Sequence, residues 1–199
     1  MATRTITVLV AALTTAAALS GCGTTAGPPS GGSPAASSVV AQGHNQADIA
    51  FAQDMISHHA QVVTMSSMAA QRAGSTDVKE LAQRIQDAHQ PEIDQMSGWL
   101  RSWNAPVPSA DHMGQTGHAP GGAIPGMMSA SQMNQLGQLS GAAFDQMFLQ
   151  MMIEDHQAAV TMSEKELGNG RSPDARQLAQ HVIDTQQHEI GDMRTLLAG

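Results

Sequence analysis

Soft metal-ligand side chains gather in the stretch “MISHHAQVVTM”, which runs from Met55 to Met65. Met55 and His59 are four residues apart, so in a helix their side chains lie on one face. Thioether sulfur favours Cu(I), and imidazole nitrogen binds copper in both oxidation states. Methionine is also a flexible side chain that fills irregular gaps in hydrophobic cores. The stretch therefore predicts either a copper site or a soft, well-packed core.

A second copy of this pattern lies 97 residues further along the chain. The copies align without a gap through two predicted helices and the turn between them, so we infer an internal duplication. It retains Met-x-x-x-His in the first helix of each copy and Glu-x-x-x-Met in the second. The aligned ligand-type pairs are Met55–Met152, His59–His156, Met65–Met162, Glu92–Glu189 and Met96–Met193.

Each copy predicts a hairpin of two long helices, because its apolar residues recur every three or four positions. Gly74 is expected to cap the first helix, and Ser172 followed by Pro173 is a strong start signal for the last. Pro91 is expected to kink or split the second helix, because it removes a backbone donor. The helices are expected at about 45–73, 75–103, 140–167 and 172–197, with a shorter one at 131–139.

Neither hairpin can bury its apolar stripe alone, so the two are expected to pack against each other. The predicted fold class is all-α: an antiparallel four-helix bundle made of two duplicated hairpins, 45–103 and 140–198, related by an approximate two-fold axis. The loop 104–130 joins the hairpins, and the folded part is expected at 44–199. A chain of this length is ample for one core.

Bundles build metal sites from side chains on facing helices. If the repeated residues face inward, two imidazoles, two carboxylates and several thioethers approach the bundle axis, and this set favours copper. The simpler alternative keeps the methionines as core filler and pairs each histidine with a glutamate as a buried polar contact. A di-iron centre is disfavoured, because Gln186 stands where the repeat would place a second copy of His89.

Two further groups of ligand-type residues have simpler explanations. His181, Asp184 and His188 share one face of the last predicted helix, and that face is expected to be solvated. The Gly- and Pro-rich loop 104–130 is either a plain linker or a loose metal trap. Its ligand-type residues are His112, Met113, His118, Met127 and Met128.

The first residues have the form of an export signal. Arg4 is followed by a short apolar run and then by Leu-Ser-Gly-Cys, which resembles a bacterial lipobox. We therefore expect a lipoprotein signal peptide at 1–21, a lipidated Cys22 and a flexible tether at 22–43, rich in Gly, Ser and Pro. An ordinary secretory signal with a chance cysteine is the alternative.

The composition excludes several function classes. Cys22 is the only cysteine, so neither a thiolate site nor a disulfide is expected in the folded part. The chain contains 14 Met and 9 His, and its formal net charge of −8 makes nucleic-acid binding unexpected. The sequence has no phosphate-binding glycine loop, cofactor fingerprint or nucleophile with a base.

Four segments of the folded part together carry a family resemblance: “FAQDMISHHAQVVTMSSMA”, “IQDAHQPEIDQMSGWL”, “IPGMMS” and “GAAFDQMFLQMMIEDHQAAVTMSE”. They resemble the secreted bacterial family known as domain of unknown function 305. The resemblance implies a ferritin-like four-helix fold and, as in some members, copper binding and copper resistance in the cell envelope. Members commonly repeat the His-His pair, whereas this chain has Asp155 before His156. The positions that the resemblance carries over are Met55, His58, His59, Met65, Met152, His156 and Met162.

The resulting hypothesis is a lipid-anchored, extracytoplasmic protein that binds copper for sequestration or delivery, without catalysis. Its expected partners are the metal ion and the membrane that holds the anchor, while no protein partner is specified. Two alternatives come from other classes: a helical interaction module at the cell surface, and a ferritin-like di-metal oxidoreductase. The expected metal residues are Met55, His58, His59, Met65, Glu92, Met96, Met152, His156, Met162, Glu189 and Met193.

Overall fold

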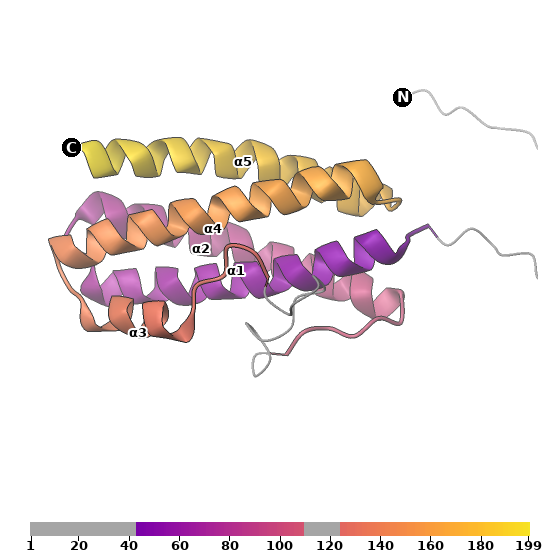
Figure 1. Cartoon of the computed structure of the whole chain (residues 1–199), viewed down its shortest axis with the longest axis horizontal. Coiled ribbons are helices and arrows are strands. Elements are labelled where there is room, and N and C mark those ends of the chain that lie inside the picture. The colour runs from indigo at the N-terminus through magenta and orange to yellow at the C-terminus, as the bar shows by residue number, and fades with distance from the viewer. Residues whose placement is uncertain (1–42, 110–123) are drawn as a thin grey trace, which may run out of the picture. The chain divides into compact units, whose positions relative to one another are not determined.

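The computed structural model describes residues 43–109 and 124–199. The expected signal peptide, Cys22 and nearly all of the expected tether lie outside these ranges. Within them every regular element is a helix, and none of these helices has the length and apolarity needed to cross a membrane. The helices are α1 (Gln46–Arg72), α2 (Thr76–Ser102), α3 (Ala130–Gln138), α4 (Ala142–Asn169) and α5 (Pro173–Ala198) (Figure 1).

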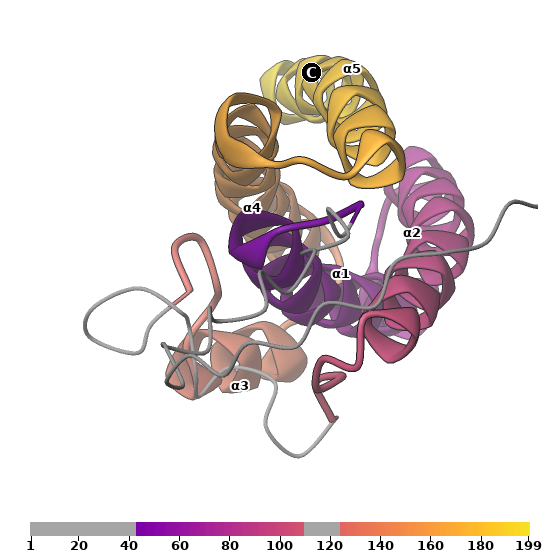
Figure 2. The ribbon, with the colours of Figure 1, turned by 90° about the vertical axis from the view of Figure 1, so that its right-hand side faces the viewer.

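The four long helices form the antiparallel bundle that the duplication predicts. α1 packs along α2 in the first hairpin, α4 packs along α5 in the second, and α1 and α4 join the hairpins. Of the four neighbouring pairs of long helices, α2 and α5 approach each other least closely. Seen along its axis, the bundle has its four helices around a common centre, and α3 lies outside them (Figure 2). The all-α bundle expected from the sequence is therefore confirmed.

The turn between α1 and α2 differs from the expected helix cap. α1 ends at Arg72 and its C-cap is Ala73, which is extended, so the expectation that Gly74 caps the helix is wrong. A Cβ atom at Gly74 would lie 2.9 Å from the Cα of Gly141, the residue that precedes α4. Glycine is required at this position because the backbones of two connecting segments touch.

The two prolines inside helices behave differently. Pro173 opens α5 at its first residue with Ser172 as the N-cap, as expected. Pro91 does not split α2, which is continuous from Thr76 to Ser102, so that part of the expectation is wrong. Pro91 and Asp87, whose carbonyl lacks the usual helical donor, are both exposed. Water can therefore satisfy that carbonyl, and the helix continues.

Two aspartates tie each hairpin to the turn of the other hairpin. Asp48 on α1 accepts hydrogen bonds from the backbone N–H groups of 171–172, at 2.9 and 2.8 Å. Asp145 on α4 accepts from the N–H groups of 74–75, at 3.0 and 2.8 Å. The aspartates are 97 positions apart, and so are the turns. The two clamps are therefore copies of each other, which supports the approximate two-fold axis.

A further carboxyl group, Glu166 on α4, is buried beside Asp48 and has no counterpart, because Ala69 occupies the equivalent position. Burial, followed by the hydrogen bond and charge of Asp48, raises the pKa of Glu166 to about 8. Burial alone would also raise the pKa of Asp48, but its hydrogen bonds from Glu166 and the backbone outweigh burial and lower that pKa. At neutral pH, Glu166 therefore keeps its proton and donates it to ionised Asp48.

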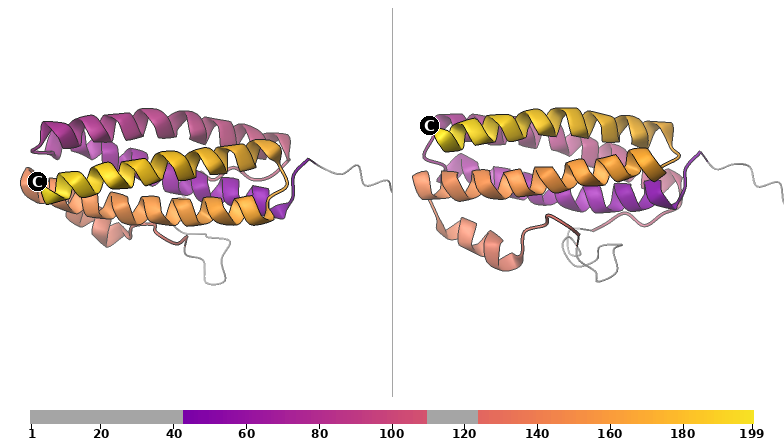
Figure 3. Two further views of the ribbon diagram at one scale, coloured as in Figure 1. Left: turned by 90° about the horizontal axis from the view of Figure 1, so that it is seen from above. Right: turned by 45° about the horizontal axis from the view of Figure 1, so that its top comes forward.

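The apolar core of the bundle consists of two clusters. One is built around Phe51, Ile56 and Leu100 together with the first half of α5. The other is built around Phe144 and Phe148 together with the first half of α2. The segment 124–129 and α3 cover the side of the bundle formed by α1 and α4 (Figure 3). They contribute Ile124 to the first cluster and Met128 and Leu136 to the second.

Candidate metal centre

Two histidine–glutamate pairs lie at equivalent positions in the two hairpins. Nε2 of His59 on α1 lies 2.6 Å from Oε2 of Glu92 on α2. Nε2 of His156 on α4 lies 2.9 Å from Oε2 of Glu189 on α5. Both imidazoles are buried, whereas the carboxylate side chains keep 13 and 18 % of their area exposed. The repeated histidine and glutamate therefore meet within each hairpin.

A third imidazole, that of His89 on α2, lies between these two pairs. Its ring centroid is 4.3 Å from that of His59 and 5.7 Å from that of His156. Its Nδ1 donates to the carbonyl of Ile85 at 2.8 Å, and its Nε2 lies 3.4 Å from the amide nitrogen of Gln186. Gln186 is the repeat equivalent of His89, so this contact joins corresponding positions of the two halves.

His58 and Asp155 form another contact between repeat-equivalent residues. Nδ1 of His58 lies 3.0 Å from Oδ1 of Asp155, and its Nε2 donates to the carbonyl of Pro125 at 2.6 Å. Burial by itself lowers the pKa of His58, but the carboxylate of Asp155 outweighs burial and raises it. Oδ2 of Asp155 lies 4.0 Å from Nδ1 of His156. A buried polar layer thus crosses the bundle between the two hairpins.

Burial sets the charge of two imidazoles in this layer. It lowers the pKa of His59 and of His89 to about 3, so both rings are neutral at pH 7. A neutral ring has one N–H and one lone pair. Because the carboxylate of Glu92 accepts a hydrogen bond from Nε2 of His59, the lone pair of His59 lies on Nδ1. The Nδ1 atoms of His59 and His156 are buried and have no hydrogen-bond partner among the described residues.

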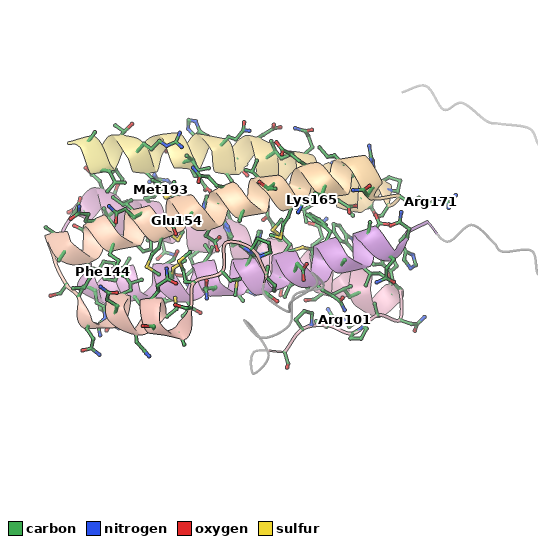
Figure 4. The ribbon with its side chains drawn as sticks, viewed as in Figure 1. Arg101, Phe144, Glu154, Lys165, Arg171 and Met193 are labelled. Atoms are coloured by element: carbon green, nitrogen blue, oxygen red, sulfur yellow. The ribbon has the colours of Figure 1, made fainter. Side chains whose placement is uncertain are left out.

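The repeated methionines are all buried, in two groups. Three lie in each core cluster, and each methionine of one cluster has its repeat equivalent in the other. Each cluster takes two of these methionines from one hairpin and one from the other. Sulfur atoms, yellow in Figure 4, lie between the helices. The first cluster holds Met55, Met96 and Met162, and the second holds Met152, Met193 and Met65.

The structure does not collect all the expected ligands in one place. In the part of the chain that it describes, no three side chains among His, Cys, Asp and Glu are placed to hold a metal ion together. It provides two equivalent places instead. Each combines a buried imidazole with a glutamate that contacts its Nε2 atom. A methionine lies four residues before the histidine, on the same helical face. They are Met55–His59–Glu92 and Met152–His156–Glu189.

His181 on α5 extends one of these places to the surface. Its side chain is 61 % exposed, and its Nε2 lies 3.7 Å from Oε1 of Glu92. Glu92 therefore lies between an exposed imidazole and the buried imidazole of His59. Burial raises the pKa of Glu92, although neighbouring histidines oppose that rise. The expected solvated face of α5 is confirmed, since His181, Asp184 and His188 are all exposed.

Two of the ligand-type residues in the loop 104–130 pack against the bundle. The N–H of Met128 donates to Oε1 of Gln61 at 2.6 Å, and its carbonyl accepts from Nε2 of Gln61 at 2.9 Å. Met128 belongs to the second core cluster, and Met127 packs against the first. Both therefore serve as packing residues. His112, Met113 and His118 lie outside the described residues.

Sequence reasoning did not assign two members of the polar layer. His89 is not repeated, so a search for repeated ligands passes over it, although it lies three residues before Glu92 and shares its helical face. Asp155 differs from the histidine of the family pattern, and the sequence alone gives it no further role. Its alignment with His58 at the repeat spacing was the available signal, because residues on the symmetry axis of a duplication face their own equivalents.

Comparisons with known proteins agree with the bundle. A family model described as domain of unknown function (DUF305) matches residues 48–197. A DUF305 protein of Streptomyces coelicolor, described as secreted, is 33 % identical in sequence; the match covers 76 % of this chain and 92 % of that one, with a TM-score of 0.68. A DUF305 fragment of Deinococcus radiodurans is 28 % identical over 77 % of this chain and 97 % of that one, with a TM-score of 0.66.

A further solved relative is CopM in its Cu(II)-bound form. It is 29 % identical, the match covers 76 % of this chain and 95 % of CopM, and the TM-score is 0.64. CopM has also been solved in Cu(I)-bound and Ag-bound forms. Among curated proteins, no sequence match was found.

Proposed function

Because this chain belongs to the DUF305 family, we propose that it is a copper-binding protein of the cell envelope that holds the ion through methionine and histidine side chains. Support comes from CopM, a relative solved in Cu(I)-, Cu(II)- and Ag-bound forms. The relative described as secreted supports an extracytoplasmic location. In this proposal the protein sequesters or delivers the ion and has no catalytic step.

The observation that carries the proposal is the orientation of the two repeated imidazoles. In His59 and His156, Nε2 is held by a glutamate, while Nδ1 is buried without a hydrogen-bond partner. Histidine ligands of metal ions usually donate their second N–H to a carboxylate, which fixes the tautomer and the ring orientation. We therefore assign Glu92 and Glu189 to orienting the imidazoles, and Nδ1 to the metal ion.

Thioethers complete each proposed site. Met55 and Met152 lie four residues before His59 and His156, and side chains on a helix point back toward the preceding turn. Each methionine is fully buried in a core cluster with two other repeated methionines. Soft sulfur beside an imidazole favours Cu(I) or Ag(I) over the harder ions of oxygen-ligand sites. The structure thus supports one soft site in each hairpin.

Direct titration tests the proposal. The purified protein should bind Cu(I), supplied through competition with a chromophoric chelator, with one ion for each hairpin. His59→Ala should remove one ion, and His59→Ala with His156→Ala should remove both. His188→Ala changes an exposed histidine and is the matched control. Full binding in a folded double variant would refute the assigned ligands, and elemental analysis that finds iron or manganese would favour the oxidoreductase alternative.

Two further measurements keep the test independent of folding. Ag(I) should raise the midpoint of thermal unfolding of the wild type, by the linkage that stabilises any ligand-binding native state. Glu92→Gln with Glu189→Gln should weaken metal affinity about 10- to 100-fold, the usual cost of removing such a carboxylate. An unchanged affinity would show that these glutamates do not orient the ligands.

The proposed membrane anchor is Cys22. The Leu-Ser-Gly-Cys sequence supports lipidation of this residue after removal of the preceding segment. In a bacterial host the wild-type protein should fractionate with membranes, and mass spectrometry should find acyl chains on Cys22. Cys22→Ser should release the protein to the soluble fraction. A wild type that is soluble and unmodified would refute the anchor and leave the copper proposal intact.

A further inference from the structure

The seam between α2 and α5 is the least closely packed part of the bundle, and two surface hollows lie along it. One has a volume of about 200 Å³, and the other about 290 Å³. The first is lined by Gln95, Asp174, Gln177, Leu178 and His181. The second is lined by Asp77, Glu80, Arg84, Asp192, Thr195 and Leu196.

The two hollows are copies of one another. Asp77 and Asp174 occupy the same position of the repeat, and Gln95 in the first hollow corresponds to Asp192 in the second. They differ at three positions that matter for a cation: Glu80 and Asp192 make the second hollow more acidic than the first, and the third position decides whether a neutral ligand is present. His181 lines the first hollow, whereas its equivalent Arg84 lines the second. One hollow therefore presents a metal ligand, and the other presents a fixed positive charge that cannot be deprotonated.

The ligand in the first hollow leads to the buried site. Nε2 of His181 lies 3.7 Å from Oε1 of Glu92, and the other oxygen of the same carboxylate lies 2.6 Å from Nε2 of His59. The exposed fraction of the side chain falls along this series, from 61 % at His181 to 13 % at Glu92 and 1 % at His59. These side chains form a graded path of alternating imidazole and carboxylate from the solvent to the interior.

We propose that His181 and Glu92 form the station at which a copper ion enters, and that the α2–α5 seam has this one entrance. The inference rests on the proposed copper function and adds the route. Imidazole nitrogen binds copper in both oxidation states, so the station can pass on Cu(I) with no change of oxidation state. The described residues do not place these three groups as a finished site, so the station holds the ion only in passing. At the equivalent position the guanidinium of Arg84 has no lone pair for a metal ion, so the carboxylates of the second hollow can attract a cation but no ligand there passes it inward, and entry is slow.

Because the two halves differ at this position, exchanging their residues gives a matched test. The full-length protein is mixed rapidly under anaerobic conditions with Cu(I) supplied as its acetonitrile complex, the reaction is stopped with a Cu(I) chelator after set intervals, and protein-bound copper is measured by atomic absorption. His181→Arg should slow uptake about tenfold or more, because it removes the ligand and adds a repelling charge. The final amount of bound copper should be unchanged. Arg84→His should accelerate uptake by opening the second hollow.

The control is His188→Arg, which adds the same charge to an exposed position of α5 outside both hollows. It should leave the uptake rate at the wild-type value. Equal rates for wild type and His181→Arg, with copper still bound, would overturn the entrance and leave the proposed function standing. A loss of bound copper at equilibrium in His181→Arg would also overturn it, because His181 would then be a storage ligand. A wild type that binds no copper would refute the proposed function itself.

Discussion

Nδ1 of His58 lies 3.0 Å from Oδ1 of Asp155, and these two residues occupy the same position in the two halves of the duplicated chain. A symmetric chain with histidine in both halves would bring two imidazoles together there. The second nitrogen of His58 donates to the carbonyl of Pro125. The carboxylate of Asp155 lies at ion-pair distance and raises the pKa of His58, so we interpret the two residues as a buried ion pair in which both ring nitrogens carry a hydrogen.

Removing the carboxylate should strongly destabilise the protein. Asp155→Ala leaves a buried imidazolium without its counter-charge, and breaking one partner of a buried pair costs about 3 kcal/mol or more. Urea denaturation followed by circular dichroism measures the change. Asp184→Asn, on the exposed face of α5, is the control and should stay within about 0.5 kcal/mol of the wild type. A loss of similar size in both variants would contradict the buried ion pair.

The same pair should make stability depend on pH in a defined direction. The pKa of His58 in the folded protein is raised above its ordinary value, so the folded state binds the proton more tightly than the unfolded chain. This stabilisation is complete below the unfolded pKa, about 6.5, and is lost as pH rises through the folded pKa. The difference in unfolding free energy between wild type and Asp155→Ala should therefore be larger at pH 6 than at pH 9. An equal difference at both values would show that His58 is neutral.

The fold was largely predictable because the duplication determines how the helices are connected and paired. Two copies in one register give two hairpins, and two apolar stripes that cannot be buried separately give the bundle. The ends of α1, α2 and α5 were expected within a residue or two, since Asn45, Ser75 and Ser172 are typical N-cap residues. The role of Gly74 was missed, because close approach to Gly141 is a contact between the two halves that no local pattern encodes.

Only those residues of the candidate site that recur in both halves were predictable from the sequence. Residues that recur could be matched, so the pairing of His59 with Glu92 was a natural alternative from the start. His89 and Asp155 do not recur, and a search for repeated ligands passes over them. Their contacts cross the approximate two-fold axis, where each residue faces its own equivalent. Burial, which decides the protonation of His59, also depends on packing that helical periodicity indicates only coarsely.

The two aspartate clamps should differ in strength although they are copies. Asp48 is fully buried and accepts three backbone hydrogen bonds, whereas Asp145 is half-buried and accepts two. Hydrogen bonds to charged groups contribute about 1.5–3 kcal/mol, and burial increases the cost of losing them. Asp48→Ala should therefore lower the unfolding free energy more than Asp145→Ala, as measured by guanidinium denaturation. The reverse order would contradict the burial argument.

The carboxyl pair of Glu166 and Asp48 predicts a second pH dependence. It has the same direction, but it comes from a neutral acid and not from a buried cation. The pKa of Glu166 is raised to about 8, so the unfolded chain releases this proton near pH 4.5 while the folded protein keeps it. Stability therefore falls as pH rises from about 4.5 to about 8. Glu166→Gln keeps a donor to Asp48 and does not titrate. It should match the wild type at pH 5 and exceed it at pH 8 by at least about 1 kcal/mol, since one pKa unit corresponds to about 1.4 kcal/mol.

Exposed Glu164 provides the control for that measurement. Glu164→Gln lies on the same helix, two residues away, and should have the same pH profile as the wild type. Denaturation curves at several pH values between 5 and 8 compare the three proteins. Parallel profiles for Glu166→Gln and the wild type would mean that Glu166 is already ionised at neutral pH.

Gly126, the one glycine of the segment 124–129 that covers α1 and α4, should be sensitive to substitution. Its φ angle is +83°, and an added Cβ would lie 2.2 Å from the Cβ of Ala158 and 3.1 Å from Cε1 of His58. Gly126→Ala combines backbone strain with a clash against α4, so it should cost about 2 kcal/mol or more and loosen the contact between Pro125 and His58. Gly191→Ala, inside α5 with open space around it, should instead stabilise the protein by about 0.5–1 kcal/mol. Thermal unfolding of both variants should therefore shift in opposite directions, and a neutral Gly126→Ala would show that the 124–129 segment does not pack against α4 as described.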